Sequence, residues 1–307
     1  MSERRLVVLG TASQVPTRTR NQGGYLLRWD EQGFLFDPGE GIQQQMIHAG
    51  LSASEITKIF ITHFHGDHCL GLAGIVQRLS LDAVENTVEV YFPASGKAFY
   101  ESLCNSTIYY HGVKLEAHPI ATEGKIFEDE HLEITTRPLD HTVDTWGYRI
   151  QEKDTFTLLP QRLERLGIHG RDAGLLKKHG HIDSKGQRIT IEEAGVKRKG
   201  QGFAFVMDTR VCKNASILAE NADMALIEST YLSDREASAS AHKHLTAAQA
   251  AKIARDAGVK QLILSHFSQI YPQTKAFEQE AGAIFKGARA AKEMDSIPVK
   301  KRQRIRG

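Results

Sequence analysis

The stretch Thr62-His63-Phe64-His65-Gly66-Asp67-His68 places four side chains that can bind a metal ion within six residues. It includes the end of the apolar run 56–62, which predicts a buried strand. Imidazole and carboxylate are ligands that zinc prefers. In an extended segment, side chains two residues apart lie on one face, so His63 and His65 can hold one ion. A turn at Gly66 directs Asp67 and His68 towards a second ion, and the stretch therefore predicts a two-metal site.

Further candidate ligands follow apolar runs elsewhere in the chain. Asp140-His141 comes at the end of the run 132–139, Asp208 after 204–207, and His266 after 262–265. Strand ends at one edge of a sheet collect functional loops, so these residues are expected near the histidine stretch. Each one alone is also consistent with a buried histidine or a turn aspartate. As a set, they complete two metal coordination shells.

Short apolar runs separated by turn residues predict a fold dominated by strands. The runs 6–9, 24–27 and 33–36 predict an antiparallel meander, and Asp37-Pro38-Gly39 ends it. Strands in both halves of the chain, with helices between them, indicate an α/β (α+β) sandwich of sheets with helices outside. The other expected strands are 56–62, 87–92, 131–137, 146–150, 202–207, 224–228 and 261–265, and the expected helices are 41–49, 71–79 and 245–257.

Residues 151–201 interrupt this pattern. They contain 11 Lys and Arg against 7 Asp and Glu, a surplus of four positive charges, and 161–178 is expected to form short helices broken by glycines. The segment is either an insertion that projects from the domain or an ordinary solvated excursion. The C-terminal residues 299–307 carry five basic residues and no acidic one. They are interpreted as a solubilising tail or as an auxiliary phosphate contact.

Composition limits the classes of function. The formal net charge is +2, so any attraction to nucleic acid must come from local patches. The three cysteines, Cys69, Cys104 and Cys212, form no C-x-x-C pair and fit a reducing compartment. No signal-peptide pattern and no apolar stretch of about 18 residues is present. The sequence therefore predicts a cytoplasmic protein with no membrane association.

The pattern His63-x-His65-x-Asp67-His68, with the three downstream ligand candidates, resembles the metallo-β-lactamase superfamily. A more specific resemblance, over nearly the whole chain, is to the ribonuclease Z family of tRNA 3′-processing endonucleases. The histidine stretch indicates only the superfamily. The family is indicated by GTASQVPTRTRN at 10–21, FDPGEG at 36–41, MDTR at 207–210, IEST at 227–230 and SHFS at 265–268.

This resemblance implies a metallo-β-lactamase fold, an αββα four-layer sandwich in which 1–307 form a single domain. It makes 151–201 an inserted, projecting arm that is a candidate tRNA-binding site. Two Zn²⁺ ions per subunit are implied, with Mn²⁺ as the alternative. The implied ligands of the first ion are His63, His65 and His141; those of the second are Asp67, His68 and His266, with Asp208 bridging the pair.

The resemblance also implies two catalytic residues. Asp67 is the proton acceptor for the attacking water. His244, just before the predicted helix 245–257, contacts the scissile phosphate or protonates the leaving oxygen. His242 is a rival for that role, and its spacing to Gln249 fits the family less well.

Glu228 and Glu40 are candidates for orienting ligand histidines, because metal-bound histidines usually donate their second N–H to a partner. The alternative for each is an ordinary strand-end or turn carboxylate. The chain also departs from the family at two places. Residues 167–172 read GIHGRD where the arm tip is usually rich in Gly and Pro, and Ile270 stands where an Arg usually precedes the Tyr.

The function implied is hydrolysis of a phosphodiester at the 3′ end of precursor tRNA by a homodimer, which removes the 3′ trailer and leaves a tRNA 3′-hydroxyl. The first alternative is a two-zinc hydrolase of small phosphodiesters or of sulfate or lactone esters on the same fold. The second is a non-catalytic RNA-binding protein. The basic insertion 151–201 disfavours the first alternative, and the complete set of seven ligand candidates disfavours the second.

Overall fold

The structure, a computed structural model, describes residues 4–184 and 186–300. It divides into two compact units. The core unit comprises 4–127, 134–150 and 202–300, and the inserted unit comprises 128–133 and 151–201. Of the predicted basic tail, residues 301–307 lie outside the described residues.

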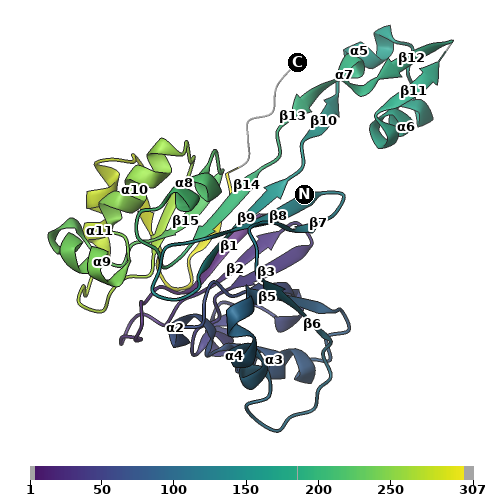
Figure 1. Cartoon of the computed structure of the whole chain (residues 1–307). Coiled ribbons are helices and arrows are strands. Elements are labelled where there is room, and N and C mark those ends of the chain that lie inside the picture. The colour runs from purple at the N-terminus through teal and green to yellow at the C-terminus, as the bar shows by residue number, and fades with distance from the viewer. Residues whose placement is uncertain (1–3, 185, 301–307) are drawn as a thin grey trace. The chain divides into compact units, whose positions relative to one another are not determined.

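The first sheet is built mainly from the N-terminal third of the chain (Figure 1). β1, β2 and β3 form the predicted antiparallel meander, and β4, β5 and β6 continue the sheet in parallel. The order is β18-β1-β2-β3-β4-β5-β6. The strands are β1 Arg5–Gly10, β2 Gly24–Trp29, β3 Gln32–Phe36, β4 Ile56–Phe60, β5 Val88–Pro93, β6 Leu115–Ile120 and β18 Ser296–Pro298.

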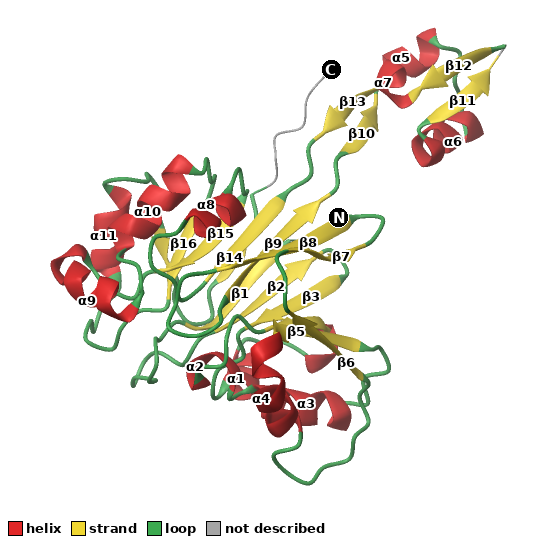
Figure 2. Cartoon of the chain, in the orientation of Figure 1, coloured by secondary structure: helices red, strands yellow, loops and turns green. Residues whose placement is uncertain are grey.

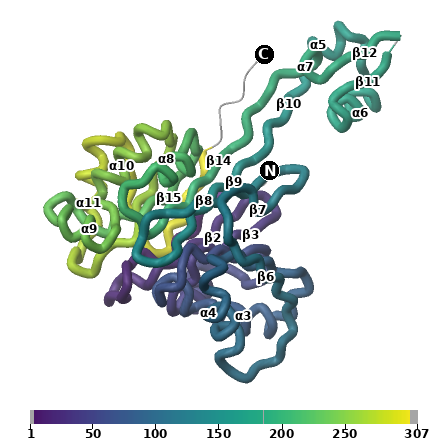
Figure 3. The backbone as a smooth tube through the Cα atoms, viewed as in Figure 1, coloured from purple at the N-terminus to yellow at the C-terminus, as the bar shows by residue number. Residues whose placement is uncertain are grey.

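The second sheet is built from later segments, which the tube in Figure 3 shows as the teal-to-yellow part of the core unit. Its order is β17-β16-β15-β14-β9-β8-β7, and β14, β15, β16 and β17 run parallel. The strands are β7 Gly124–Glu128, β8 Leu132–Pro138, β9 Trp146–Glu152, β14 Gly202–Val206, β15 Met224–Glu228, β16 Leu262–Ser265 and β17 Arg289–Ala290.

Helices cover the outer face of each sheet (Figure 2). Alternate strand residues such as Leu26 and Leu35 face α1 Ile42–His48, α3 Leu72–Leu81 and α4 Lys97–Cys104. On the other sheet, Ala204 and Ile227 face α8 Lys213–Ala219, α10 Ala247–Asp256 and α11 Lys275–Gly282. The remaining helices of the core unit are α2 Gly66–Cys69, α9 Glu236–His242 and the short 3₁₀ turns η1 Ala53–Glu55, η2 Ala94–Gly96 and η3 Ser233–Arg235. In the described parts of the chain, no helix is both long enough and apolar enough to cross a bilayer.

Aromatic rings fill the space between the two sheets. Phe36 of β3 stacks on Phe60 of β4, with ring centroids 4.9 Å apart, and on Phe205 of β14 at 4.5 Å. Tyr148 of β9 lies 5.0 Å from Phe60, and its hydroxyl donates a 2.6 Å hydrogen bond to the carbonyl of Ile61. Rings of this size bury a large apolar area, so the middle layer fixes the two sheets against each other.

Parallel strands bring the candidate ligands to one edge of the sandwich. β4 leads into the histidine stretch, β14 into Asp208 and β16 into His266. The backbone N–H of Trp146, at the start of β9, donates to the carbonyl of Thr62 and joins the two sheets beside this edge. Ligand sites in sheets with parallel strands form outside the carboxyl ends of the strands, and this edge is such a place.

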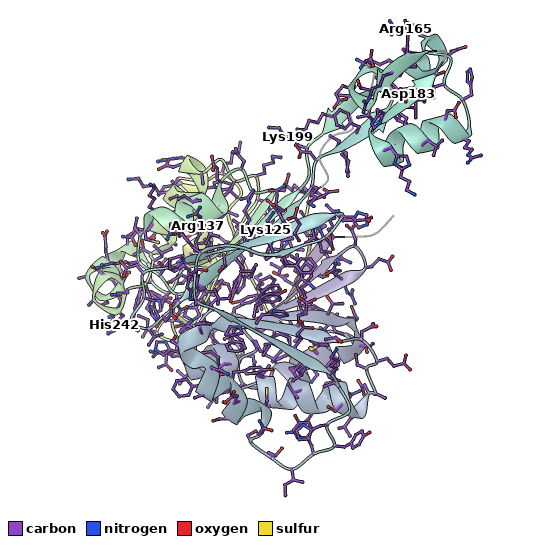
Figure 4. All side chains as sticks on the ribbon, turned by 45° about the vertical axis from the view of Figure 1, so that its right-hand side comes forward. Lys125, Arg137, Arg165, Asp183, Lys199 and His242 are labelled. Carbon is purple, nitrogen blue, oxygen red and sulfur yellow. The ribbon has the colours of Figure 1, made fainter. Side chains whose placement is uncertain are left out.

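The inserted unit has a small core of its own. β10 Thr155–Leu158 pairs with β13 Gly195–Arg198, and β11 His181–Ser184 pairs with β12 Gln187–Thr190. Its helices are α5 Pro160–Arg165, α6 Arg171–His179 and α7 Ile191–Ala194. The buried side chains are Ile168, Leu176, Ile189, Ile191 and Ala194. Residues 167–172, which depart from the family's usual arm tip, run from the end of α5 into α6 and supply the core residue Ile168. Figure 4 labels Arg165 and Asp183 on this unit.

Candidate metal centre

The first group of ligand candidates surrounds one oxygen of Asp208. His63 Nε2 lies 3.0 Å from His65 Nδ1, which lies 3.4 Å from His141 Nε2. Asp208 Oδ2 is 3.7 Å from His63 Nε2 and 3.6 Å from His141 Nε2. The ligand atoms of these four residues all lie within 4.8 Å of one another. The structure thus brings together the set that the resemblance implies for the first ion.

The second group surrounds the other oxygen of the same aspartate. Asp208 Oδ1 lies 3.4 Å from His68 Nε2 and 3.3 Å from His266 Nε2. Asp67 Oδ2 is 3.3 Å from each of these two nitrogens. All seven predicted ligands are therefore gathered at one place, and Asp208 presents one oxygen to each group.

These residues fit metal ions on two observations. Ligand atoms about 2.0–2.1 Å from one zinc ion lie about 3.3 Å apart at the corners of a tetrahedron, and the separations above are close to this value. Among the described residues, His68 Nε2 and Asp208 Oδ1 are also buried and have no hydrogen-bond partner. Buried polar atoms are normally paired, so both atoms are suited to a bound cation. The arrangement therefore fits a metal-ion site.

Two carboxylate–threonine pairs orient four of the histidines. The Thr62 hydroxyl donates to Asp37 Oδ2 at 2.8 Å and accepts from His63 Nδ1 at 3.0 Å, and the same Asp37 oxygen accepts from His68 Nδ1 at 2.9 Å. In the second pair, the Thr230 hydroxyl donates to Glu228 Oε2 at 2.7 Å. Its oxygen lies 2.9 Å from His266 Nδ1, and Glu228 Oε1 lies 2.9 Å from His244 Nδ1. Holding Nδ1 in this way turns Nε2 towards the metal site.

Asp37 is one residue of the site that the sequence interpretation missed. It is fully buried, and its other oxygen accepts from the Thr62 N–H at 2.7 Å. Glu40, the residue proposed from sequence, is exposed, and its hydrogen bonds with Asn21 and Gln22 are made by its backbone. Within the described residues, the carboxylate beside His68 Nδ1 is therefore Asp37 and not Glu40. Asp37-Pro38-Gly39 was interpreted only as a turn, although the position of Asp37 at the end of a buried strand indicates a role at the site.

The two rival histidines occupy different environments. His244 is buried, lies between Glu228 and Asp208, and its ring centroid is 5.0 Å from that of His141. His242 lies at the exposed end of α9 (Figure 4). Its Nδ1 is 2.9 Å from the Ser238 carbonyl. Only His244 of the pair therefore faces the metal site.

The electrostatics of the site favour a cation. Burial would raise the pKa of Asp208, but His266 and His68 hold it well below the usual value. Burial likewise opposes ionisation of Asp67, and His68 and His266 lower its pKa. For His63, burial and the neighbouring His68 lower the pKa well below 6.5, which keeps the neutral, ligating form. For His244, burial lowers the pKa, but Glu228 and Asp208 outweigh it and raise the pKa to about 9.

The fold and the site define a metal-dependent hydrolase of the metallo-β-lactamase type. A family model described as "Beta-lactamase superfamily domain" matches residues 172–267, and one described as "Anti-Pycsar protein Apyc1" matches 4–142. The solved structure of human tRNase Z, short form, has a TM-score of 0.72 and 24% identity, covering 97% of this chain and all of that chain.

The chain belongs to the ribonuclease Z family, and it is thus a nuclease. It is 49% identical to the ribonuclease Z of Streptomyces avermitilis over 304 residues, which is 98% of this chain and 100% of the relative. It is 44% identical to that of Chlamydia abortus over 301 residues, 98% of each. The predicted family and the predicted fold are confirmed, whereas the roles of individual ligands stay predictions.

We predict that Asp37→Asn weakens metal binding, because the amide cannot serve both Thr62 and the His68 N–H as the carboxylate does. Loss of such a partner typically lowers metal affinity about 10- to 100-fold. Competition with a chromophoric zinc chelator measures the effect. Glu40→Gln, three residues away, is the matched control and should keep the affinity of the original chain; equal losses in both variants would contradict the assignment of Asp37.

Proposed function

We propose that this protein is a zinc-dependent endoribonuclease that hydrolyses a phosphodiester at the 3′ end of precursor tRNA. The product is a tRNA with a free 3′-hydroxyl, and the trailer is released. The proposal is supported by full-length similarity to proteins named ribonuclease Z and by the fold of human tRNase Z. The observation that carries it is the position of His244, whose Nδ1 lies 4.0 Å from Asp208 Oδ2, so that a candidate proton donor lies beside the proposed two-ion site.

Zinc is the metal we infer, with manganese as the alternative. Five imidazoles and two carboxylates form the proposed ligand set, and borderline-soft zinc prefers nitrogen donors more than magnesium or calcium does. When bound, two such ions would supply an activated water near neutral pH and positive charge opposite the phosphate oxygens.

Asp67 is the residue to which we assign the role of accepting the proton of the attacking water. Its Oδ2 is held by the backbone N–H of Gln14 at 2.7 Å and by the flanking His68 and His266. These contacts keep the carboxylate ionised and fix its direction. In the proposed reaction the water oxygen bonds to phosphorus, and its proton passes to Asp67.

His244 is the residue to which we assign protonation of the leaving group. Its Nδ1 is occupied by Glu228 and Thr230, so its Nε2 remains to donate. Glu228 and Asp208 raise the pKa of this ring to about 9, which favours its protonated form. As the bond from phosphorus to the ribose 3′-oxygen breaks, this proton passes to that oxygen and yields the 3′-hydroxyl.

The inserted unit is the part that we propose contacts the tRNA away from the cleaved bond. Its exposed cations on α5, α6 and β12 are Arg165, Arg171, Lys177, Lys178 and Arg188. Double-helical RNA is recognised largely through its shape and its phosphates, which such a surface suits. We also propose that the protein is a homodimer and that it is cytoplasmic, as the family resemblance implies.

The direct test is cleavage of precursor tRNA by the zinc-loaded protein. We predict a cut at the 3′ trailer that leaves a tRNA 3′-hydroxyl, together with slower turnover of a small phosphodiester. Asp67→Ala should abolish both reactions, because the proton acceptor and a predicted ligand are lost together. Turnover of the small phosphodiester without any cleavage of precursor tRNA would favour the small-molecule hydrolase instead.

A second prediction separates the two rival histidines. His244→Ala should lower kcat on precursor tRNA by about 10²–10⁴-fold, since general acid catalysis typically contributes that much. Zinc content, measured on the same samples, should remain at two ions per chain. His242→Ala is the matched control and should keep the original kcat. A His244→Ala variant with undiminished kcat would remove the proposed role.

A third prediction concerns the inserted unit. Reversing two charges on α6, with Lys177→Glu and Lys178→Glu, should raise KM for precursor tRNA about tenfold and reduce its dependence on salt. Turnover of a small phosphodiester should not change. Lys252→Glu with Lys286→Glu in the core unit gives the same change of net charge as a control. An equal rise of KM in both double variants would show that only overall charge matters.

A further inference from the structure

The loop that carries His141 and the loop that carries Asp208 are not joined by a strand ladder. They follow β8 and β14, and β9 lies between these strands in the sheet. The segment that carries His244 belongs to neither strand and follows α9. Some other contact must therefore fix the separations of these three residues, on which the site depends.

Asp140 supplies one such contact. Its backbone N–H donates to the Thr209 hydroxyl at 3.1 Å, and its carbonyl accepts from the Arg210 N–H at 3.1 Å. Its carboxylate accepts from Arg210 Nε at 2.6 Å. Three bonds thus attach the residue before His141 to the two residues after Asp208.

Lys243 supplies a second contact that fixes these separations. Its ammonium lies 3.0 Å from Asp140 Oδ1 and donates to the His141 carbonyl at 2.8 Å. Its own carbonyl lies 3.2 Å from His141 Nδ1. A carbonyl can only accept, so His141 must carry its proton on Nδ1, and Nε2 is left to face the metal site.

The backbone of Lys243 shows that this contact is built into the turn. Its φ is +56° and its ψ is 50°, in the left-handed region that a side chain with a Cβ rarely adopts. This turn ends α9, directs the Lys243 carbonyl to His141, and starts the segment in which His244 reaches Glu228. This one turn therefore fixes the positions of both His141, a candidate ligand of the first ion, and His244, the proposed proton donor.

We propose that Asp140 and Lys243 are positioning residues, which together fix His141 and His244 relative to Asp208. The inference rests on the proposed metal ligation and reaction. Ion pairs that are partly exposed, as this one is, contribute little to stability by themselves. A large effect of removing the pair on metal binding would therefore come from misplaced ligands and not from general destabilisation.

The test compares Lys243→Met with the original chain. Zinc affinity is measured by chelator competition, and the ligand geometry is followed by the visible absorption of the cobalt-substituted protein. We expect one of the two ions to bind about 10- to 100-fold more weakly, as for other residues that orient metal ligands. The cobalt spectrum should change, and kcat should fall while KM for precursor tRNA stays within about twofold.

Two further variants make the outcome specific. Lys243→Arg can still donate to both the carbonyl and the carboxylate, and it should recover most of the affinity. Lys260→Met removes another lysine–aspartate ion pair, at 2.7 Å to Asp223, from segments that carry no ligand, and it should change neither metal affinity nor the spectrum. If Lys243→Met does not fold, Asp140→Asn is expected to give the same loss for one ion.

Unaltered metal affinity and an unaltered cobalt spectrum in both Lys243→Met and Asp140→Asn would overturn the inference. An equal loss in Lys260→Met would overturn it as well, because the effect would then be one of general stability. If the original chain binds no metal, the proposed function falls together with this inference. If the original chain binds metal and the variants keep its metal affinity and cobalt spectrum, only this inference is overturned, and the proposed function stands.

Discussion

The carboxylate of Asp208 is the contact on which the rest of the site depends. Its Oδ2 lies 3.6–3.7 Å from the Nε2 atoms of His63 and His141, in the first ligand group. Its Oδ1 lies 3.3–3.4 Å from the Nε2 atoms of His68 and His266, in the second group. Removing it would leave two half-sites with no shared ligand. It is nearly fully buried, and a charge in such a place is stable only beside counter-charges, which here are histidines or metal ions.

The scaffold holds Asp208 in a backbone conformation with positive φ, which residues other than glycine rarely adopt. Five residues at the site other than glycine have positive φ: Gln14, Asp37, Asp208, Lys243 and His266. Such conformations cost on the order of 1–3 kcal/mol each and persist only when the surrounding structure enforces them. The aromatic layer around Phe36 and the parallel strands of both sheets provide that rigidity. The fold thus places metal-site residues in loops whose shapes are fixed by the sandwich beneath them.

The sequence predicted the strands with clear apolar runs and the gathering of seven ligand candidates, because both follow from local pattern at strand ends. It did not predict α4, α8 and α11, which are only seven or eight residues long, or β6, most of whose residues are exposed or half-exposed. Asp37 was missed because a turn motif explained it already, and Glu40 was chosen in its place. The pairing of Asp140 with Lys243 joins residues about a hundred positions apart and leaves no local signal.

The central claim is that one aspartate joins two metal ions, and anomalous X-ray diffraction at the zinc absorption edge tests it most directly. Crystals of the zinc-loaded protein should show two anomalous peaks about 3.5–4 Å apart, with one Asp208 oxygen next to each. A single peak, or two peaks of which neither touches Asp208, would contradict the account.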